Sequence, residues 1–479
     1  MESIEVDSEI GRKSSGSSGL TRKYGLLTAI AMVVGCVVGS GIFFRTGKVL
    51  EESGGNVGIG VLAWICGGLI MIVCAFAFAT LAKKHEKVNG FTDYTEALCG
   101  KKFGYLSGWF MATIYGPATM AILPWVAAMF TSTLLGLSGD PREGMFIFAL
   151  AAMYLALVYA MTVLAPKIAG YFQISTTIVK LIPIVLVGVV GIIVGVARGA
   201  NIADAVDMFE NETVRNVSIF GAIFSTAFAY AGWDAVAAIN SEIKNSRRNL
   251  PIALTFGSVL IIALYVLYFL GVSGAGNKDV LMNNTFDGTQ SAISSVFGSF
   301  ASSVLLVFII ISCLGTTNGH TMATNRHIYS LSIRGHGPFP KLFNKLDKET
   351  NTPVNGSTLS FALTYVWLFV HMIAEMNLFG EHYLDISEIT VFGFSAFSVP
   401  LFLMFVVKEK DLHWVNRFVF PILATLASGF LVVALFIATP VIALVYTIII
   451  LVVTAIGALF LLSKNDNVQH PVDDSSFVD

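Results

Sequence analysis

The chain has 479 residues, of which 55% are hydrophobic and only 13% are charged. A soluble domain carries about 25% charged residues, so this composition excludes a soluble enzyme and a disordered scaffold. The 29 basic and 31 acidic residues give a net charge of −2, which leaves no basic surface for a nucleic-acid partner. We therefore expect an all-α integral membrane protein embedded in a lipid bilayer.

Long apolar runs predict twelve membrane-spanning helices, because each crossing needs about 20 largely apolar residues. Residues 21–465 form the expected transmembrane domain, between a disordered cytosolic tail at 1–20 and a second cytosolic tail at 466–479. The expected helices lie at 24–45, 57–82, 103–135, 145–164, 170–196, 217–241, 249–272, 290–319, 355–375, 385–406, 414–437 and 440–462.

The distribution of basic residues predicts the orientation. With the N-terminus inside, 22 of the 29 basic residues fall in inner segments and 6 in outer segments, while Lys180 lies within a span. Inner loops of membrane proteins are enriched in Lys and Arg. We therefore expect a multi-pass protein of the cell membrane with both termini in the cytoplasm.

Two of the expected helices are interrupted by small residues. Gly39, Ser40 and Gly41 lie in the middle of the first helix, where each glycine costs about 1 kcal/mol relative to alanine. Residues 228–234 interrupt the sixth helix in the same way. Unwound backbone at membrane depth must be buried in protein or line a cavity, and amides that begin a half-helix suit a carboxylate. Close packing of small residues against a neighbouring helix is the alternative.

The interrupted helices begin two blocks of five spans, at 24–196 and 217–406, followed by two further helices at 414–462. An odd number of spans inverts the second block relative to the first. This pattern is typical of transporters with inverted repeats and a binding site near the middle of the membrane.

Lys180 and Asp234 lie within the spans. Lys180 is about 15 Å from the inner end of its helix, near the middle of a ~30 Å hydrocarbon core. An ionised Lys there costs roughly 2.5–3.5 kcal/mol unless it faces a polar interior. It is either a structural residue bonded to backbone carbonyls or a functional one. Asp234 could titrate with a coupled proton, bind a cationic substrate, or satisfy backbone groups freed by the break.

These motifs, in this order, resemble the amino acid–polyamine–organocation superfamily, and within it the L-type amino acid transporters and their bacterial relatives. The resemblance rests on residues 38–43 (VGSGIF), 228–233 (FAYAGW), 241–245 (SEIKN), 248–251 (RNLP), 318–319 (NG) and 337–340 (GPFP). It covers residues 20–465. It implies a LeuT-like fold of 5+5 inverted repeats plus two C-terminal helices, with helices 1 and 6 unwound at their middle.

The resemblance also implies roles for individual residues. The substrate carboxylate would meet the amides of Gly39, Ser40 and Gly41, and the Lys180 ammonium would take the position of a coupling cation. The substrate ammonium would meet backbone carbonyls, and the Phe228 ring would act as a gate. The implied carbonyls are those of Val37, Phe228 and Ala231. Asp234, near which family members commonly have Asn or another small polar residue, is a further candidate substrate-binding residue. Thr317 and Asn318 are candidate pocket or gate residues, for which interhelical hydrogen bonding is the alternative.

The expected function is sodium-independent secondary transport of small neutral L-amino acids by alternating access, as an exchanger or a proton symporter. A polyamine or organic-cation transporter of the same fold is the first alternative, and a non-transporting membrane sensor is the second. No nucleotide-binding or catalytic motif is present, so we expect no enzyme activity and no cofactor.

Five cysteines show no metal-binding or disulfide spacing. The loop at 131–144 lacks the cysteine that animal L-type members use to bind a heavy chain, so no disulfide-linked heavy chain is expected.

Overall fold

The computed structural model describes residues 24–85, 90–137, 143–198, 218–235, 243–283, 285–376 and 384–462. These residues are almost entirely helical, with one isolated β-bridge between Tyr24 and Ile243. Both expected tails lie outside the described residues, so those two expectations stay predictions.

Within the described residues, ten helical segments are long and apolar enough to cross a bilayer. A bent pair adds an eleventh: α1 (Leu26–Val37) and α2 (Ser40–Glu52) meet at 41°. The ten are α3 (Val57–Lys84), α5 (Lys101–Phe110) continued through a π-helical turn (Met111–Tyr115) into α6 (Gly116–Leu134), α7 (Glu143–Leu164), α8 (Pro166–Ala197), α11 (Ser246–Ala275), α13 (Thr285–Ile333), α15 (Val354–Glu375), α16 (Ile386–Lys408), α17 (Phe420–Ala438, preceded by the π-helical turn Val415–Val419) and α18 (Pro440–Leu462).

The expected sixth helix is described only in part. Helix α9 (Ile219–Ala229) is apolar but short, and a turn follows at residues 230–234. The rest of the expected span, from residue 236, lies outside the described residues. The interruption of both expected helices is therefore observed, whereas the full length of the sixth helix is not.

Two stretches with charged residues are helical where we expected loops. Helix α13 continues to Ile333, well beyond the expected end at 319, because Arg326 and His327 are buried by protein rather than placed in a solvated loop. Helix α4 (Gly90–Cys99) occupies a stretch that we expected to be a loop, and its Asp93 and Glu96 pair with Arg334. Two short helices, α12 (Lys278–Asn283) and α14 (Pro340–Phe343), lie in other connections.

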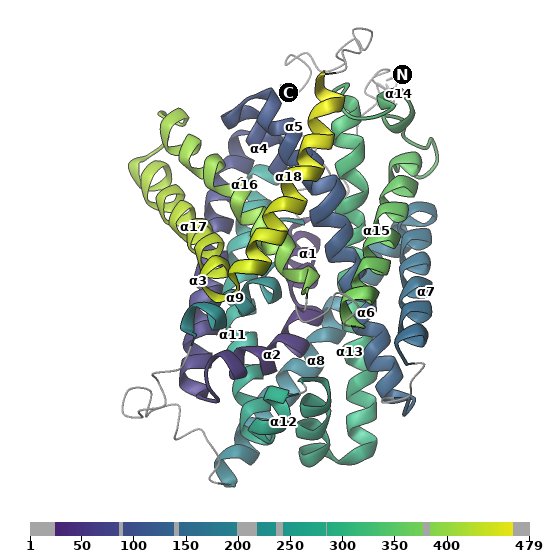
Figure 1. Ribbon diagram of the computed structural model, residues 1–479, viewed down its shortest axis with the longest axis vertical. Coiled ribbons are helices and arrows are strands. Elements are labelled where there is room, and N and C mark those ends of the chain that lie inside the picture. Colours follow the sequence, from purple (N-terminus) through teal and green to yellow (C-terminus); the bar gives the residue numbers. More distant parts are fainter. Residues whose placement is uncertain are drawn as a thin grey trace, which may run out of the picture.

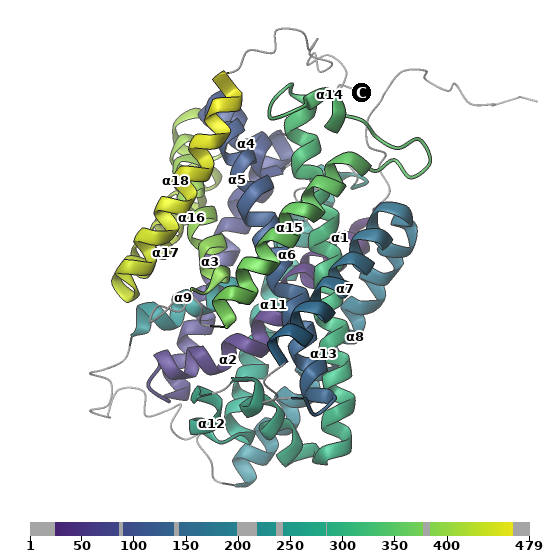
Figure 2. The ribbon, with the colours of Figure 1, turned by 45° about the vertical axis from the view of Figure 1, so that its right-hand side comes forward.

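The long helices run roughly along the longest axis of the molecule (Figures 1 and 2). Helices α4 and α14 and the C-terminal end of α18 lie at one end, whereas α12 lies at the other. Basic residues mark the first of these ends, which we call the basic end: Lys83 and Lys84 end α3, and Lys101 and Lys102 begin α5. The end near α12 is called the opposite end.

Candidate functional site

The first helix break consists of buried backbone between α1 and α2. Val38 is extended (φ −71°, ψ 99°), and Gly39 has φ −151° and ψ −135°. The Ser40 hydroxyl is buried and has no hydrogen-bond partner among the described residues. Because the first N–H groups of any α-helix lack an intrahelical acceptor, the start of α2 supplies donors inside the molecule. A Cβ atom on Gly39 would lie 2.8 Å from the Thr316 Cβ, so a larger residue does not fit.

The second break is the turn that follows α9. Gly232 has a φ of +101°, which residues with a side chain rarely adopt. A Cβ atom there would lie 2.7 Å from His320 Nε2 and 2.9 Å from the Cys36 carbonyl oxygen. The turn therefore requires glycine for its backbone conformation and for its close contact with α1 and α13.

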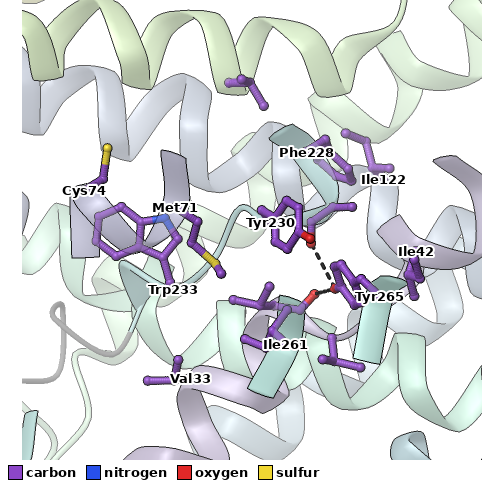
Figure 3. Close-up of a cluster of buried hydrophobic side chains, with 14 of the residues drawn as sticks. Val33, Ile42, Met71, Cys74, Ile122, Phe228, Tyr230, Trp233, Ile261 and Tyr265 are labelled. Carbon is purple, nitrogen blue, oxygen red and sulfur yellow. Dashed lines mark hydrogen bonds between the residues drawn. The ribbon is translucent and has the colours of Figure 1, made fainter. Parts of the chain in front are cut away.

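The two breaks lie against each other. A Cβ atom on Gly41 would lie 2.5 Å from the Ala229 Cα. The Tyr265 hydroxyl of α11 lies 2.8 Å from the Val37 carbonyl oxygen and 3.0 Å from that of Ala229, the last residues of α1 and α9 (Figure 3). One hydroxyl proton is thus shared between two helix ends. Carbonyl acceptors and the amide donors of α2 occur together in one buried region, which can bind opposite charges at once.

Lys180 reaches the first break from α8. Its ammonium donates to the Gly35 carbonyl oxygen at 2.6 Å and lies 3.0 Å from Thr316 Oγ1. The Thr316 hydroxyl is also 3.0 Å from the Val38 carbonyl oxygen. The ammonium is completely buried, and these contacts join α8 and α13 to the unwound backbone.

Asp234 lies on the second break and faces the π-helical turn before α6. The Tyr115 hydroxyl donates to Asp234 Oδ1 at 2.8 Å. A cavity of about 60 Å³ lies beside this pair and is lined also by Ala231, Trp233 and Ser395. Turns of π-helix often occur at functional sites, and this one presents a phenol to a buried carboxyl group.

Phe228 lies in the last turn of α9, before the second break, and its ring lies near the buried Arg45. Its ring is 5.7 Å from the Phe44 ring, and the Arg45 guanidinium carbon lies 4.9 Å from the Phe44 ring centre and 5.8 Å from that of Phe228. Arg45 pairs with Asp385 at 2.6 Å and also donates to Ser387. Helix α2 is therefore fastened to the start of α16, and we call this ion pair the outer latch.

A cavity of about 470 Å³ extends from the outer latch toward the opposite end of the molecule. Its walls include Trp125, His371 and Glu388 together with Arg45. Burial disfavours ionisation of Asp385, but the nearby Arg45 guanidinium and hydrogen bonds from Ser387 outweigh it and lower the Asp385 pKa below its usual value of 3.8. Asp385 is therefore ionised at neutral pH.

Thr317 and Asn318, the two polar residues expected to line a pocket or gate, form hydrogen bonds within α13 and with α8. The Thr317 hydroxyl donates to the Cys313 carbonyl oxygen at 2.9 Å, within α13. Asn318 Nδ2 donates to the Ala169 carbonyl oxygen at 3.0 Å and to Gln173 Oε1 at 2.9 Å, both on α8. Thr316, one residue earlier, contacts the first break from α13, and His320 Nε2 lies 3.2 Å from the Cys36 carbonyl oxygen near the end of α1.

Residues 24–460 match the protein family described as Amino acid permease. The chain belongs to the amino acid permease family. The permease is 28% identical to the serine/threonine exchanger SteT of Bacillus subtilis (strain 168) over 421 residues, which are 86% of the permease and 91% of SteT. The permease is thus a multi-pass membrane protein of a transporter family and not an enzyme.

Two human transporters are also similar to the permease. The b(0,+)-type amino acid transporter 1 is 24% identical over 440 residues, which cover 91% of the permease and 87% of that protein. The cystine/glutamate transporter is 25% identical over 357 residues, 73% and 68% of the two chains. The family resemblance read from the breaks is therefore confirmed, and amino acid transport is the shared activity of these relatives.

Several residues of the permease's breaks and latch were not singled out from the sequence. Tyr265, Thr316 and Tyr115 lie in uniformly apolar or small-residue runs, where nothing distinguishes one hydroxyl from another. Arg45 and Asp385 lie at expected helix ends, where charged residues are ordinary. Their roles depend on contacts between distant segments.

Proposed function

We propose that the permease carries small neutral L-amino acids across the cell membrane by alternating access and without sodium. The observation that carries this proposal is the contact between the two helix breaks, which brings amide donors and carbonyl acceptors into one buried region. An amino acid has one carboxylate and one ammonium group, and each needs one of these partners.

In this proposal the substrate carboxylate is bound by the amides at Gly39, Ser40 and Gly41. The Ser40 hydroxyl, which has no partner among the described residues, supplies a further donor. The substrate ammonium is bound by backbone carbonyls at Val37, Phe228 and Ala231. A carbonyl oxygen has two lone pairs, so Val37 can accept from the substrate as well as from Tyr265.

Sodium independence is proposed from the contacts of Lys180. Its ammonium is held by the Gly35 carbonyl and by Thr316 beside the unwound backbone of the first helix. Oxygen ligands of this kind would suit a metal cation. A fixed ammonium in the same position makes a transported cation unnecessary.

The preference for small side chains is proposed from the space beside the second break. The cavity next to Asp234 has a volume of only about 60 Å³, and Ala231 and Trp233 contribute to its walls. Exchange is favoured over proton symport because SteT is a serine/threonine exchanger. Asp234 favours a polyamine or other organic cation as the second candidate substrate.

The overall arrangement proposed is a LeuT-like fold of twelve helices with both termini in the cytoplasm. The eleven candidate spans and the short helix α9 support this count. The basic end, which carries the ends of α3 and the start of α5, would face the cytoplasm. The permease would act without a disulfide-linked heavy chain: residues 138–142 of the 131–144 loop lie outside the described residues, but the five cysteines are all elsewhere.

The proposal is tested by uptake into liposomes that contain the purified permease. Radiolabelled serine, alanine, leucine, glutamate, arginine and spermidine would be compared with and without internal unlabelled amino acid, sodium and a pH gradient. We expect uptake of the small neutral amino acids that needs internal substrate and not sodium. Uptake of spermidine alone would favour the second candidate, a sodium requirement would contradict the role of Lys180, and absence of any uptake would refute amino acid transport.

A further inference from the structure

A groove lies on the outside of the helix bundle near the basic end, separate from the cavity beside the second break. Helices α3 and α11 form two of its walls, and the segment that leads into α17 forms the third. Its volume is about 810 Å³. Since the chain is a multi-pass membrane protein, a hollow on its outer wall at this level opens to lipid.

The inner part of the groove is apolar. Phe256 and Val259 of α11 are 58% and 55% exposed there, an exposure that is stable only against an apolar neighbour. Phe76 of α3 closes the groove by stacking on Phe420 of α17, with 4.9 Å between the ring centres. These four side chains form a surface for a hydrocarbon chain.

The rim of the groove carries charges of both signs. Lys83 is exposed and lies about 10 Å from Phe76 along α3, at 1.5 Å per residue. Asp411 is 68% exposed and accepts a hydrogen bond from Lys84 at 2.6 Å. This hydrogen bond lowers the Asp411 pKa, and Lys84 also pairs with Glu409. Lys83 has no ion-pair partner among the described residues, so the rim offers this cation and the fixed Asp411 carboxylate in the same groove.

We propose that this groove binds one phospholipid with an ethanolamine-type headgroup. Its phosphate is bound by Lys83 and its primary ammonium by Asp411, while an acyl chain lies on Phe256, Val259 and Phe76. A headgroup with only negative charge meets the Asp411 carboxylate, and a choline headgroup has no N–H group to donate to it. Charge complementarity therefore selects a zwitterion with a primary ammonium.

The test is native mass spectrometry of the purified full-length permease with phosphatidylethanolamine, phosphatidylcholine or phosphatidylglycerol. We expect the wild type to retain the ethanolamine lipid about two- to five-fold better than the choline lipid, the contribution of one exposed ion pair. Asp411→Asn should remove this preference, and Lys83→Gln should lower retention of all three lipids. Asp347→Asn and Lys348→Gln, in an exposed loop at the same end, are the matched controls.

A second variant tests the apolar part without changing charge. Val259→Trp fills the groove and should abolish the retained lipid, whereas Ile178→Trp, at a 65% exposed position on α8, should not. Equal retention of the three lipids by the wild type, or groove variants that behave like their controls, would show ordinary surrounding lipid and overturn the proposal. Competition by soluble glycerophosphoethanolamine at equal concentration would refute the role of the acyl chain.

Discussion

Lys180 shows how a single charge is tolerated at membrane depth. An ionised lysine in the hydrocarbon core costs roughly 2.5–3.5 kcal/mol, yet this one is completely buried in protein rather than exposed to lipid. The Gly35 carbonyl and the Thr316 hydroxyl replace its hydration. Removing the ammonium would leave the Thr316 hydroxyl oxygen without its donor and the Gly35 carbonyl oxygen with only the 3.3 Å contact from the Thr316 hydroxyl, which is unfavourable for buried groups.

We therefore expect Lys180→Met to lower amino acid uptake about tenfold or more, the effect of losing roughly 1.4 kcal/mol at the first break. Uptake would be measured in liposomes, in sodium and in choline buffer, and the loss should be equal in both. Lys167→Met, at the exposed start of α8, is the control. Wild-type uptake by Lys180→Met would eliminate any functional role for this ammonium.

The Tyr265 hydroxyl connects the ends of α1 and α9. Tyr265→Phe keeps the ring and removes a hydrogen bond worth about 1 kcal/mol, so both half-helices lose a shared partner. We expect slower exchange and a lower melting temperature in detergent. Tyr171→Phe, at a 74% exposed position, should change neither. If Tyr265→Phe matched that control, the contact would be incidental.

The sequence was informative about Lys180 and much less so about Tyr265. A lysine in an otherwise apolar run is conspicuous, because its burial requires polar partners that the run itself does not contain. A tyrosine in α11 is ordinary, and Tyr268, three residues further along the same helix, has the same hydroxyl group. Its two acceptors are 228 and 36 residues away, and only the packing of the helices selects them.

At the scale of secondary structure, the second break depends on Gly232. An alanine there must adopt a positive φ and place a methyl group against His320 and the Cys36 carbonyl. We expect Gly232→Ala to destabilise the fold by about 1–2 kcal/mol or more, measured by thermal unfolding in detergent. Gly429→Ala in α17 is the matched control: nothing lies within 4 Å of its Cβ position, and alanine favours a helix by about 1 kcal/mol. Equal effects at both positions would contradict this account of the turn.

The outer latch is an ion pair that joins α2 to the start of α16 near the Phe228 ring. Because both charges are largely buried, Arg45→Gln should leave the Asp385 carboxylate without its partner, and Asp385→Asn should do the same to Arg45. We expect each single variant to lower exchange several-fold, and a double-mutant cycle to give a coupling of about 0.5–3 kcal/mol. Lys48→Gln and Glu51→Gln, which remove an exposed pair on the same helix, should couple by less than about 0.5 kcal/mol.

The pH dependence of the latch follows from the lowered pKa of Asp385. A carboxyl group with a lowered pKa contributes stability above its usual value of 3.8, and this contribution is lost as the pH falls through the lowered value. Asp385 of the wild type should therefore stay ionised, and the latch should stay intact, at about pH 5 as at pH 7.5. In Arg45→Gln, burial without the guanidinium raises the Asp385 pKa, so the loss of exchange relative to wild type should be smaller at about pH 5 than at pH 7.5. A loss that grew larger at pH 5 would contradict an Asp385 carboxylate held ionised by Arg45.

The elements themselves were predicted well where hydrophobicity decides them. Apolar runs predicted each long helix, but they did not predict that α13 continues to Ile333 or that residues 90–99 form helix α4. Arg326 and His327 are buried on α13, and Asp93 of α4 pairs with Arg334. A charged residue that is satisfied by a distant partner cannot be distinguished, in a single sequence, from one that faces water.

At the scale of the whole molecule, the concentration of basic residues at one end predicts its orientation in the membrane. Lys348 lies at the basic end and Leu135 at the opposite end of α6, and both are exposed. Loops rich in Lys and Arg stay on the inner side during insertion. A membrane-impermeant maleimide added to intact cells should therefore label Leu135→Cys, whereas Lys348→Cys should be labelled only after the cells are opened. The native cysteines, which are buried or half-buried, give the background in the unsubstituted permease. Labelling of Lys348→Cys in intact cells would contradict the proposed orientation and place the basic end outside.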